Sequence, residues 1–159
     1  MLNWKFYNQE LDGDNIFTDD SRIEDKVSCA FVHFRDGIEV ESRLSYGATV
    51  FMAEVVAIKE AVEYMQKKDM RNARVISDSR YALLALNSPT EKRRILNSIK
   101  EIINGNIDLY WVKAHQGIIG NEKADTLAKE ATRHERIDYF FSKSCLHRRN
   151  EGKIKILTR

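Results

Sequence analysis

Apolar residues alternate with polar ones in the first third of the chain and recur at helical spacing after it, so two kinds of element are predicted. Asp36-Gly37 is a turn signal within the alternating part. The turn separates the last two of three predicted strands, which cover residues 15–20, 26–34 and 38–45. We expect these strands to form an antiparallel meander.

A helical stripe begins near residue 50, where apolar residues fall at positions 51, 55, 58, 62 and 65. The stripe predicts a helix over 51–67 that starts close to Thr49 or Ala48. Asn121 is a good N-cap for a last helix, which runs to about residue 133. Between these two helices the sequence predicts a strand over 74–77, helices over 79–86 and 90–103, and a strand over 107–112.

A meander followed by alternating strands and helices predicts an α/β fold, in which helices pack on a mixed sheet. The fourth strand would pair in parallel with the first through a right-handed crossover. The sheet order then changes direction between these strands, and ligands tend to bind at such a switch point. Asp19 and Asp78 lie on the two strands, so we expect them to converge there. The N-terminal Trp4, Phe6 and Tyr7 are interpreted as packing on the sheet edge.

The 159 residues fit one domain, placed at 1–135, followed by a basic C-terminal tail of uncertain structure, 136–159. Hydrophobic residues make up 43% of the chain, which is enough for a core, and no apolar run approaches the roughly 20 residues of a membrane helix. The N-terminus lacks the apolar stretch of a signal peptide. Cys29 and Cys145 have no metal-type spacing, so we interpret them as reduced thiols, with Cys29 in the core. These features favour a cytoplasmic or nuclear protein without membrane attachment.

Charge is uneven along the chain, although the formal net charge is only +2. Residues 1–65 carry a net charge of −7 and residues 66–159 a net charge of +9. A basic half indicates a polyanionic partner, and an ordinary solvated surface is the alternative. The tail alone carries +5, and it is interpreted either as a nucleic-acid contact or as a truncated remnant.

Four carboxylates stand in settings that together indicate a metal site: Asp19, Glu54, Asp78 and Asp125. Two follow apolar strands, and two fall in the first turns of predicted helices. Acidic groups a few Å apart cannot all ionise freely unless cations neutralise them, and Mg²⁺ prefers such oxygen ligands. A pair of these ions can clamp the attacking and leaving oxygens of a phosphodiester, so the chain is interpreted as a metal-dependent nuclease. His115, in a loop after a predicted strand, could shuttle a proton or help a product leave.

Each of these residues also has a plainer explanation. Asp78 could cap the helix that follows it, and Asp19 could be a turn residue at the end of its strand. Glu54 and Asp125 could be first-turn acids favoured by the helix dipole, and Asp125 could pair with Lys129. His115 could be an ordinary surface residue.

Five motifs resemble those of type 1 ribonuclease H domains, especially the domains in the polymerase proteins of non-LTR retrotransposons. They are residues 16–21 (Ile-Phe-Thr-Asp-Asp-Ser), 51–58 (Phe-Met-Ala-Glu-Val-Val-Ala-Ile), 75–83 (Val-Ile-Ser-Asp-Ser-Arg-Tyr-Ala-Leu), 111–117 (Trp-Val-Lys-Ala-His-Gln-Gly) and 120–128 (Gly-Asn-Glu-Lys-Ala-Asp-Thr-Leu-Ala). They occur in family order over about residues 14–133. The resemblance implies a ribonuclease H-like α/β fold, with a five-stranded mixed sheet of order 3-2-1-4-5 and helices on both faces.

The resemblance also implies roles for individual residues. The metal-binding acids would be Asp19, Glu54, Asp78 and Asp125, and His115 would be the mobile histidine that assists turnover. Thr49 resembles the residue that contacts a phosphate of the DNA strand. Three further residues would lie near the hybrid, namely Ser79, Arg80 and Asn121.

The implied reaction is hydrolysis of the RNA strand of an RNA–DNA hybrid by two Mg²⁺ ions, for which Mn²⁺ is a substitute, leaving 5′-phosphate and 3′-hydroxyl ends. The hybrid is the implied partner of a monomer that is part of, or derived from, a reverse transcriptase polyprotein. The alternative function is a module of the same fold that binds RNA or hybrid without cutting. A DNA-cutting enzyme of the same superfold is a third hypothesis, against which the motif from His115 to Asp125 argues.

Asp20 departs from the glycine that usually follows the first Asp in this family. Neighbouring residues of an extended strand face opposite sides, so we expect Asp20 to point away from the metal site that Asp19 serves. The chain also lacks the extra basic helix of some stand-alone members, for which Lys92-Arg93-Arg94 is a partial substitute. We therefore predict weak hybrid binding at physiological salt, with a Kd above ~10⁻⁷ M.

Overall fold

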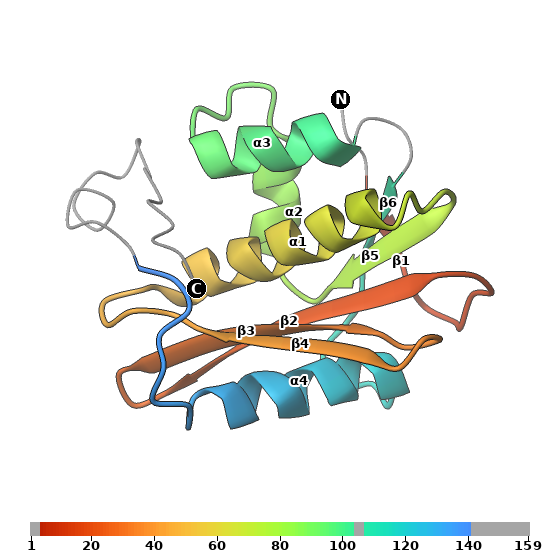
Figure 1. The fold of residues 1–159 in the computed structure, drawn as a ribbon. Coiled ribbons are helices and arrows are strands. Elements are labelled where there is room, and N and C mark those ends of the chain that lie inside the picture. Colours follow the sequence, from red (N-terminus) through yellow and green to blue (C-terminus); the bar gives the residue numbers. More distant parts are fainter. Residues whose placement is uncertain (1–3, 104–106, 141–159) are drawn as a thin grey trace.

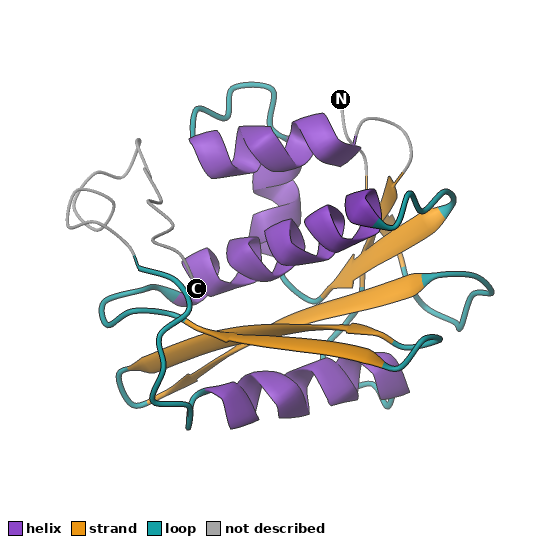
Figure 2. Ribbon diagram, in the orientation of Figure 1, coloured by secondary structure: helices purple, strands orange, loops and turns teal. Residues whose placement is uncertain are grey.

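A six-stranded mixed sheet lies at the centre of the computed structural model, with helices on both faces (Figure 1, Figure 2). The structure describes residues 4–103 and 107–140. Cys145 and the part of the predicted tail from residue 141 onward lie outside these ranges. None of the described helices combines the length and the apolar character needed to cross a bilayer.

The strands follow one another across the sheet in the order β1-β6-β5-β2-β3-β4. Their bounds are β1 Trp4–Phe6, β2 Asn15–Ile23, β3 Lys26–His33, β4 Ile38–Arg43, β5 Ala73–Ser77 and β6 Ile107–Trp111. β2, β3 and β4 form the predicted antiparallel meander, whereas β1, β6, β5 and β2 run parallel. The predicted order of five strands is confirmed, and β1 adds a sixth strand beside β6.

Two helices pack on one face of the sheet with a third above them, and the fourth covers the other face (Figure 1). In chain order the helices are α1 Val50–Lys67, α2 Arg80–Asn87, α3 Arg94–Ile103 and α4 Ile119–Ala131. The helix that covers the other face is α4. The predicted start of α1 is confirmed, because Thr49 is its N-cap. The Thr49 hydroxyl accepts a hydrogen bond of 3.1 Å from the Met52 amide.

Two other predicted helix starts are wrong. The helix predicted from residue 90 begins at Arg94, because the Glu91 side chain instead accepts hydrogen bonds from the amide and the guanidinium of Arg93 in the preceding loop. Asn121 is not an N-cap, since α4 begins at Ile119 with Ile118 in the capping position and no side-chain cap. Ile118 packs against the core, so burial of an apolar side chain outweighs capping preference here.

The core has two parts because side chains alternate along each strand. In β2, Ile16 packs with the core under α1 and α3, whereas Phe17 packs with the core under α4. The predicted burial of Cys29 is confirmed. Gly120 lets α4 approach β2 closely, because a side chain at this position would overlap the Phe17 ring. This approach brings the next turn of α4, with Asp125, over the middle of β2.

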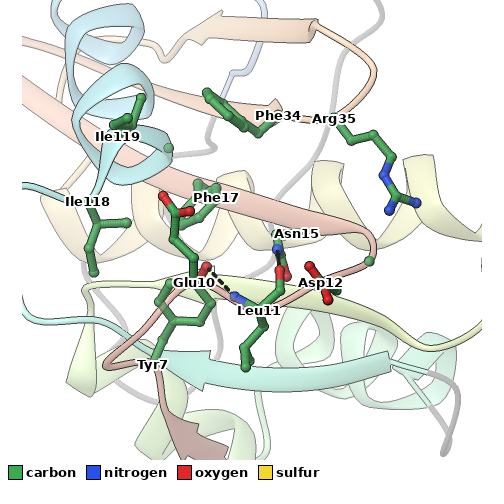
Figure 3. A pocket seen from close by; sticks show the side chains of 12 residues that line it. Tyr7, Glu10, Leu11, Asp12, Asn15, Phe17, Phe34, Arg35, Ile118 and Ile119 are labelled. Atoms are coloured by element: carbon green, nitrogen blue, oxygen red, sulfur yellow. Dashed lines mark hydrogen bonds between the residues drawn. The ribbon is translucent and has the colours of Figure 1, made fainter.

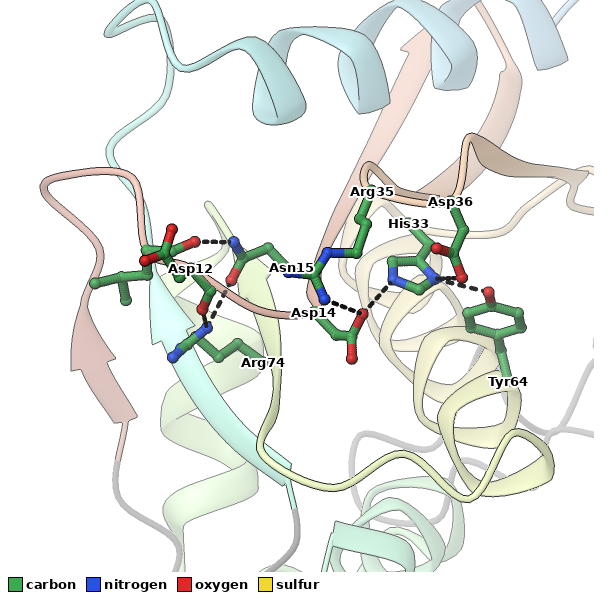
Figure 4. Close-up of polar contacts among 9 residues, drawn as sticks. Asp12, Asp14, Asn15, His33, Arg35, Asp36, Tyr64 and Arg74 are labelled. Carbon is green, nitrogen blue, oxygen red and sulfur yellow. Dashed lines mark hydrogen bonds and ion pairs between the residues drawn. The ribbon is translucent and has the colours of Figure 1, made fainter.

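Polar contacts fix the N-terminal end of β2 (Figure 4). The ring of the fully buried His33 has one nitrogen 3.0 Å from an Asp14 carboxylate oxygen and the other 2.8 Å from the Tyr64 hydroxyl. Arg74 donates a hydrogen bond of 3.1 Å to the Asn15 side chain. These contacts connect β2 to β3, α1 and β5 and fix the register on which the positions farther along β2 depend.

The first residues of the predicted tail pack on the domain. Asp138 donates its amide to the Arg43 carbonyl at 2.8 Å, and Tyr139 accepts from the Ser45 amide at the same distance. The Tyr139 side chain is only 5% exposed, and its hydroxyl donates to the Glu60 carboxylate. The segment up to residue 140 therefore belongs structurally to the domain.

Candidate active site

Asp19 and Asp78 come together because of where the pairing of two strands stops. β2 and β5 pair in parallel from Asn15↔Arg74 to Thr18↔Ser77, and β5 ends there. Each aspartate directly follows its residue of the last pair, so both carboxylates lie at the carboxyl end of the parallel part of the sheet. Side chains at this end are free to meet a ligand.

The plainer explanations for these two residues do not hold. Asp19 lies within β2, paired with Ala30, and not in a turn. Its side chain is only 7% exposed. Asp78 does not cap α2, because Ser79 is the N-cap and accepts a hydrogen bond of 3.1 Å from the Ala82 amide. Neither aspartate therefore has a structural role that accounts for it.

Asp20 joins the two aspartates in one acidic cluster. One carboxylate oxygen from each of Asp19, Asp20 and Asp78 lies within 4.8 Å of the other two. The Asp20 amide also donates a hydrogen bond of 2.8 Å to an Asp19 carboxylate oxygen. The prediction that Asp20 points away from this site is wrong. Because β5 ends at Ser77, β2 has no neighbour on that side at these positions, and side chains from both of its faces reach the open edge.

Glu54 extends the cluster from α1. Its carboxyl shares a hydrogen bond with Asp20 and accepts another from the Ser79 hydroxyl. Ser79, predicted to lie near substrate, is thus buried between Glu54 and the first turn of α2. α1 begins at Val50, so Glu54 is not in the first turn as predicted. The dipole explanation weakens accordingly, since that effect falls off within one turn.

Asp125 approaches the cluster from α4. The helix begins earlier than predicted, so Asp125 also lies beyond the first turn. Its carboxylate forms the ion pair expected with Lys129, at 2.8 Å. Its charge nevertheless raises the pKa of both Asp19 and Asp78. The structure thus brings all four predicted acids to one place.

Burial and mutual repulsion hold protons on the cluster in the absence of metal. Burial, followed by the charge of Asp78, raises the pKa of Asp19 to about 8. Burial, followed by the charges of Glu54 and Asp19, raises the pKa of Asp20 to about 9. Burial and the charge of Glu54 raise the pKa of Asp78 to about 6. A divalent cation would relieve this repulsion, so the cluster is built for positive charge.

The donor set fits a hard cation. The described residues of the cluster offer carboxylate oxygens and no thiolate or imidazole, which favours Mg²⁺ or Mn²⁺ over Zn²⁺. Two groups outside the cluster hold these oxygens in place. The Ser79 hydroxyl orients Glu54, and the Trp111 indole donates a hydrogen bond of 3.2 Å to the backbone carbonyl of Asp78.

His115 lies in the exposed loop between β6 and α4, as predicted. Its φ angle of 58° places it in the left-handed region, and Gly117 follows with a φ of 78°. The His115 side chain lowers the pKa of Asp78 electrostatically, against the larger effect of burial, so the imidazole lies within electrostatic reach of the cluster.

The remaining predicted substrate residues lie in different settings. Thr49 is exposed at the start of α1, and Arg80 is exposed at the start of α2. Asn121 is only 3% exposed, and among the described residues its side-chain oxygen has no hydrogen-bond partner.

A separate pocket of about 190 Å³ lies between the start of α4 and the loop that leads into β2 (Figure 3). Its wall includes Tyr7, Glu10, Phe17 and Ile118. The pocket shares no residue with the acidic cluster, and its volume is below the roughly 300 Å³ at which small-molecule sites begin. The acidic cluster is therefore the better candidate for the active site.

Comparison with known proteins agrees with this choice. The sequence model of the RNase H family matches residues 13–133, which contain all of the predicted site residues. No curated protein matches the chain. Members of this family are metal-dependent nucleases that bind nucleic acid, and the carboxylates of the cluster are groups that could hold the metal. Since the match covers most of the chain, this protein belongs to the RNase H family.

Proposed function

We propose that this protein is an endonuclease that hydrolyses the RNA strand of RNA–DNA hybrids with two Mg²⁺ ions, leaving 5′-phosphate and 3′-hydroxyl ends. The observation that carries the proposal is the convergence of Asp19 and Asp78 at the end of paired parallel strands, with Glu54 and Asp125 approaching from opposite faces of the sheet. Mn²⁺ would serve as a substitute, because it prefers the same oxygen ligands.

The carboxylates would divide between two ions. Asp19, Asp78 and Asp125 would hold one, and Asp19, Glu54 and Asp78 the other, with Asp20 close enough to contribute an oxygen. When bound, the ions lower the pKa of an attacking water and stabilise the leaving oxygen.

The protein's own groups would position these ligands and the substrate. Ser79 orients Glu54, and Trp111 fixes the backbone of Asp78. His115, exposed and near Asp78, is placed to move a proton or to help the product leave. Thr49 lies beside the N-terminus of α1, where a phosphate of the DNA strand would meet free backbone amides.

Of the three residues expected near the minor groove of the hybrid, the exposed Arg80 would contact it directly, whereas Ser79 and Asn121 are buried and would act from beneath the surface. RNA presents its 2′-hydroxyls in a wide and shallow minor groove, so we expect little dependence on sequence. We also propose that the catalytic domain extends past the predicted boundary at residue 135 to about residue 140. We propose further that the chain acts as a monomer, and that it is part of, or derives from, the polyprotein of a reverse-transcribing element, as its motifs imply.

A second function is favoured by one observation. Asp20 adds a carboxylate to a site that phosphates must approach, which would suit a module that binds hybrid or RNA without cutting it. The two functions make different predictions for the same assay.

The test uses labelled RNA–DNA hybrid, single-stranded RNA and double-stranded DNA, each incubated with Mg²⁺ or EDTA. Cleavage of RNA in the hybrid alone, lost in EDTA and in Asp78→Asn, is the expected result. Asp108→Asn, the same change at an exposed residue of β6, is the matched control and should cut normally. Binding without cleavage, in Mn²⁺ as well as Mg²⁺, would establish the second function instead.

A further inference from the structure

Strand β1 lies outside the part of the chain that matches the family, which begins at residue 13. It pairs in parallel with β6, so that Phe6 lies opposite Trp111. Because β1, β6, β5 and β2 all run parallel, Phe6 and Trp111 lie at the same end of the sheet as Asp19 and Asp78. β1 thus brings residues of its own to the edge where the acidic cluster lies.

Phe6, Trp111 and Arg80 form a continuous surface, here called the aromatic platform. The rings of Phe6 and Trp111 have centroids 5.1 Å apart and are tilted by 39°. The guanidinium carbon of Arg80 lies 5.4 Å from the Trp111 ring. The Trp4 ring packs against Trp111 edge-on at 6.3 Å and supports it within the fold. Phe6 is 49% exposed, so an aromatic face remains open to a ligand.

The platform is joined directly to the proposed active site. The Trp111 indole that stacks with Phe6 is the one that donates its hydrogen bond to the carbonyl of Asp78. Phe6 lies two strands away from β5, which corresponds to about 10 Å at the usual spacing of strands. A nucleic-acid strand that passes the acidic cluster can therefore reach the platform.

Open aromatic rings beside a guanidinium are the groups with which proteins bind single-stranded nucleic acid. The rings stack on bases, and the cation attracts the backbone. Bases inside a duplex are already stacked on one another and cannot present a face to Phe6. An unpaired base, which has a face left open, can bind there.

We propose that the aromatic platform stacks an unpaired nucleobase of a strand that continues from the hybrid, so that the protein prefers hybrids flanked by a single-stranded segment. The platform is a binding surface of this chain in its own right. Its link to the hybrid rests on the proposed function.

Intrinsic fluorescence offers a direct test, because the chain has two tryptophans, Trp4 and Trp111, and both belong to this region. Oligo(dT) is titrated into the protein in EDTA and low salt, and the tryptophan emission is followed. We expect saturable quenching, because a base stacked on Phe6 lies against Trp111. Phe6→Ala should weaken the affinity for oligo(dT) about fivefold or more, because losing the stacking of one base costs at least about 1 kcal/mol.

Two further variants keep the result interpretable. Phe6→Leu retains an apolar side chain for packing and removes the ring, so it should lose affinity like Phe6→Ala. Phe34→Ala removes a phenylalanine that is equally exposed, at 48%, beyond the end of β3, and should bind oligo(dT) like the wild type. Absence of quenching in the wild type, or equal affinity in the Phe6 and Phe34 variants, would overturn the proposal.

A second measurement separates this proposal from the nuclease activity. A blunt hybrid and the same hybrid with a single-stranded extension are compared for binding in EDTA, and the extension should strengthen binding to the wild type and not to Phe6→Leu. Equal binding of both hybrids would also overturn the platform, while cleavage of blunt hybrid in Mg²⁺ would leave the proposed function intact. Quenching by oligo(dT) without any hybrid cleavage would support the platform and refute the nuclease.

Discussion

Replacing Asp20 by the isosteric asparagine should stabilise the metal-free protein, and the gain should grow as pH rises. The pKa of Asp20 is raised from 3.8 to about 9, by burial first and by Glu54 and Asp19 next. Between these two values the folded protein keeps a proton that the unfolded chain has lost. The free energy of unfolding of the wild type therefore falls as pH rises through this window, and asparagine, which does not titrate, removes that contribution.

The size of the effect follows from the width of the window. Each pH unit between the unfolded and folded pKa is worth about 1.4 kcal/mol, so the three units from pH 5 to pH 8 set an upper limit of about 4 kcal/mol. Asp20 is partly exposed, so solvent screens its charge, and the repulsion that raises its pKa is shared with Glu54 and Asp19. We therefore expect about half of this limit. The advantage of Asp20→Asn over the wild type should thus increase by about 2 kcal/mol between pH 5 and pH 8.

The assay is urea unfolding in EDTA at several pH values, with the free energy in water obtained by extrapolation. Asp25→Asn, an exposed residue of the turn between β2 and β3, is the control and should differ from the wild type by the same small amount at every pH. Added Mg²⁺ should narrow the gap at pH 8, because a bound cation offsets the same repulsion. A difference between Asp20→Asn and the wild type that does not change with pH would show that the Asp20 carboxyl lies outside the cluster.

Two further changes test the framework around the site. Gly120→Ala should lower the free energy of unfolding by about 2–3 kcal/mol through overpacking, because the new methyl group meets the Phe17 ring. Urea unfolding measures this change, and a stability equal to that of the wild type would contradict the close approach of α4 to β2. Ser79→Ala should lower the free energy of unfolding by about 1 kcal/mol, because α2 loses its N-cap. It should also raise the Mg²⁺ concentration needed for half-maximal hybrid cleavage, because Glu54 loses its hydrogen bond. Ser98→Ala, at a serine of α3 away from the cluster, should leave the Mg²⁺ dependence unchanged, and a Ser79 variant that behaves in the same way would refute the positioning role.

The sheet and the four acids could be predicted because each depends on local pattern. Asp19 and Asp78 follow short apolar runs, so strand pairing alone brings them to one edge. The helical stripe fixes which side of α1 faces the sheet, and this brings Glu54 toward Asp20. Periodicity identifies elements well when they are long enough to show several repeats.

The rest depends on contacts that no local pattern encodes. β1 has three residues, too few for any period, and it is a strand because β6 offers an open edge to pair with. Tyr139 is buried because the chain returns along Arg43, far away in sequence. Asp20 faces the cluster because β5 stops at Ser77, a boundary that the alternation of side chains along β2 does not reveal.

The position of Asp20 also bears on whether the site can cut RNA. A glycine is needed where the backbone adopts a left-handed φ angle, and the backbone at Asp20 does not adopt one. Asp20 pairs regularly with Cys29 within β2 and is absent from the described residues with positive φ. The substitution therefore leaves the backbone of the site intact, and its effect is one of charge. In the metal-free protein at neutral pH, a pKa of about 9 keeps Asp20 protonated and hydrogen-bonded to Glu54. A bound cation would oppose the charge that appears when this proton leaves. The added carboxyl is thus compatible with a working metal site, which favours the nuclease over the module that only binds.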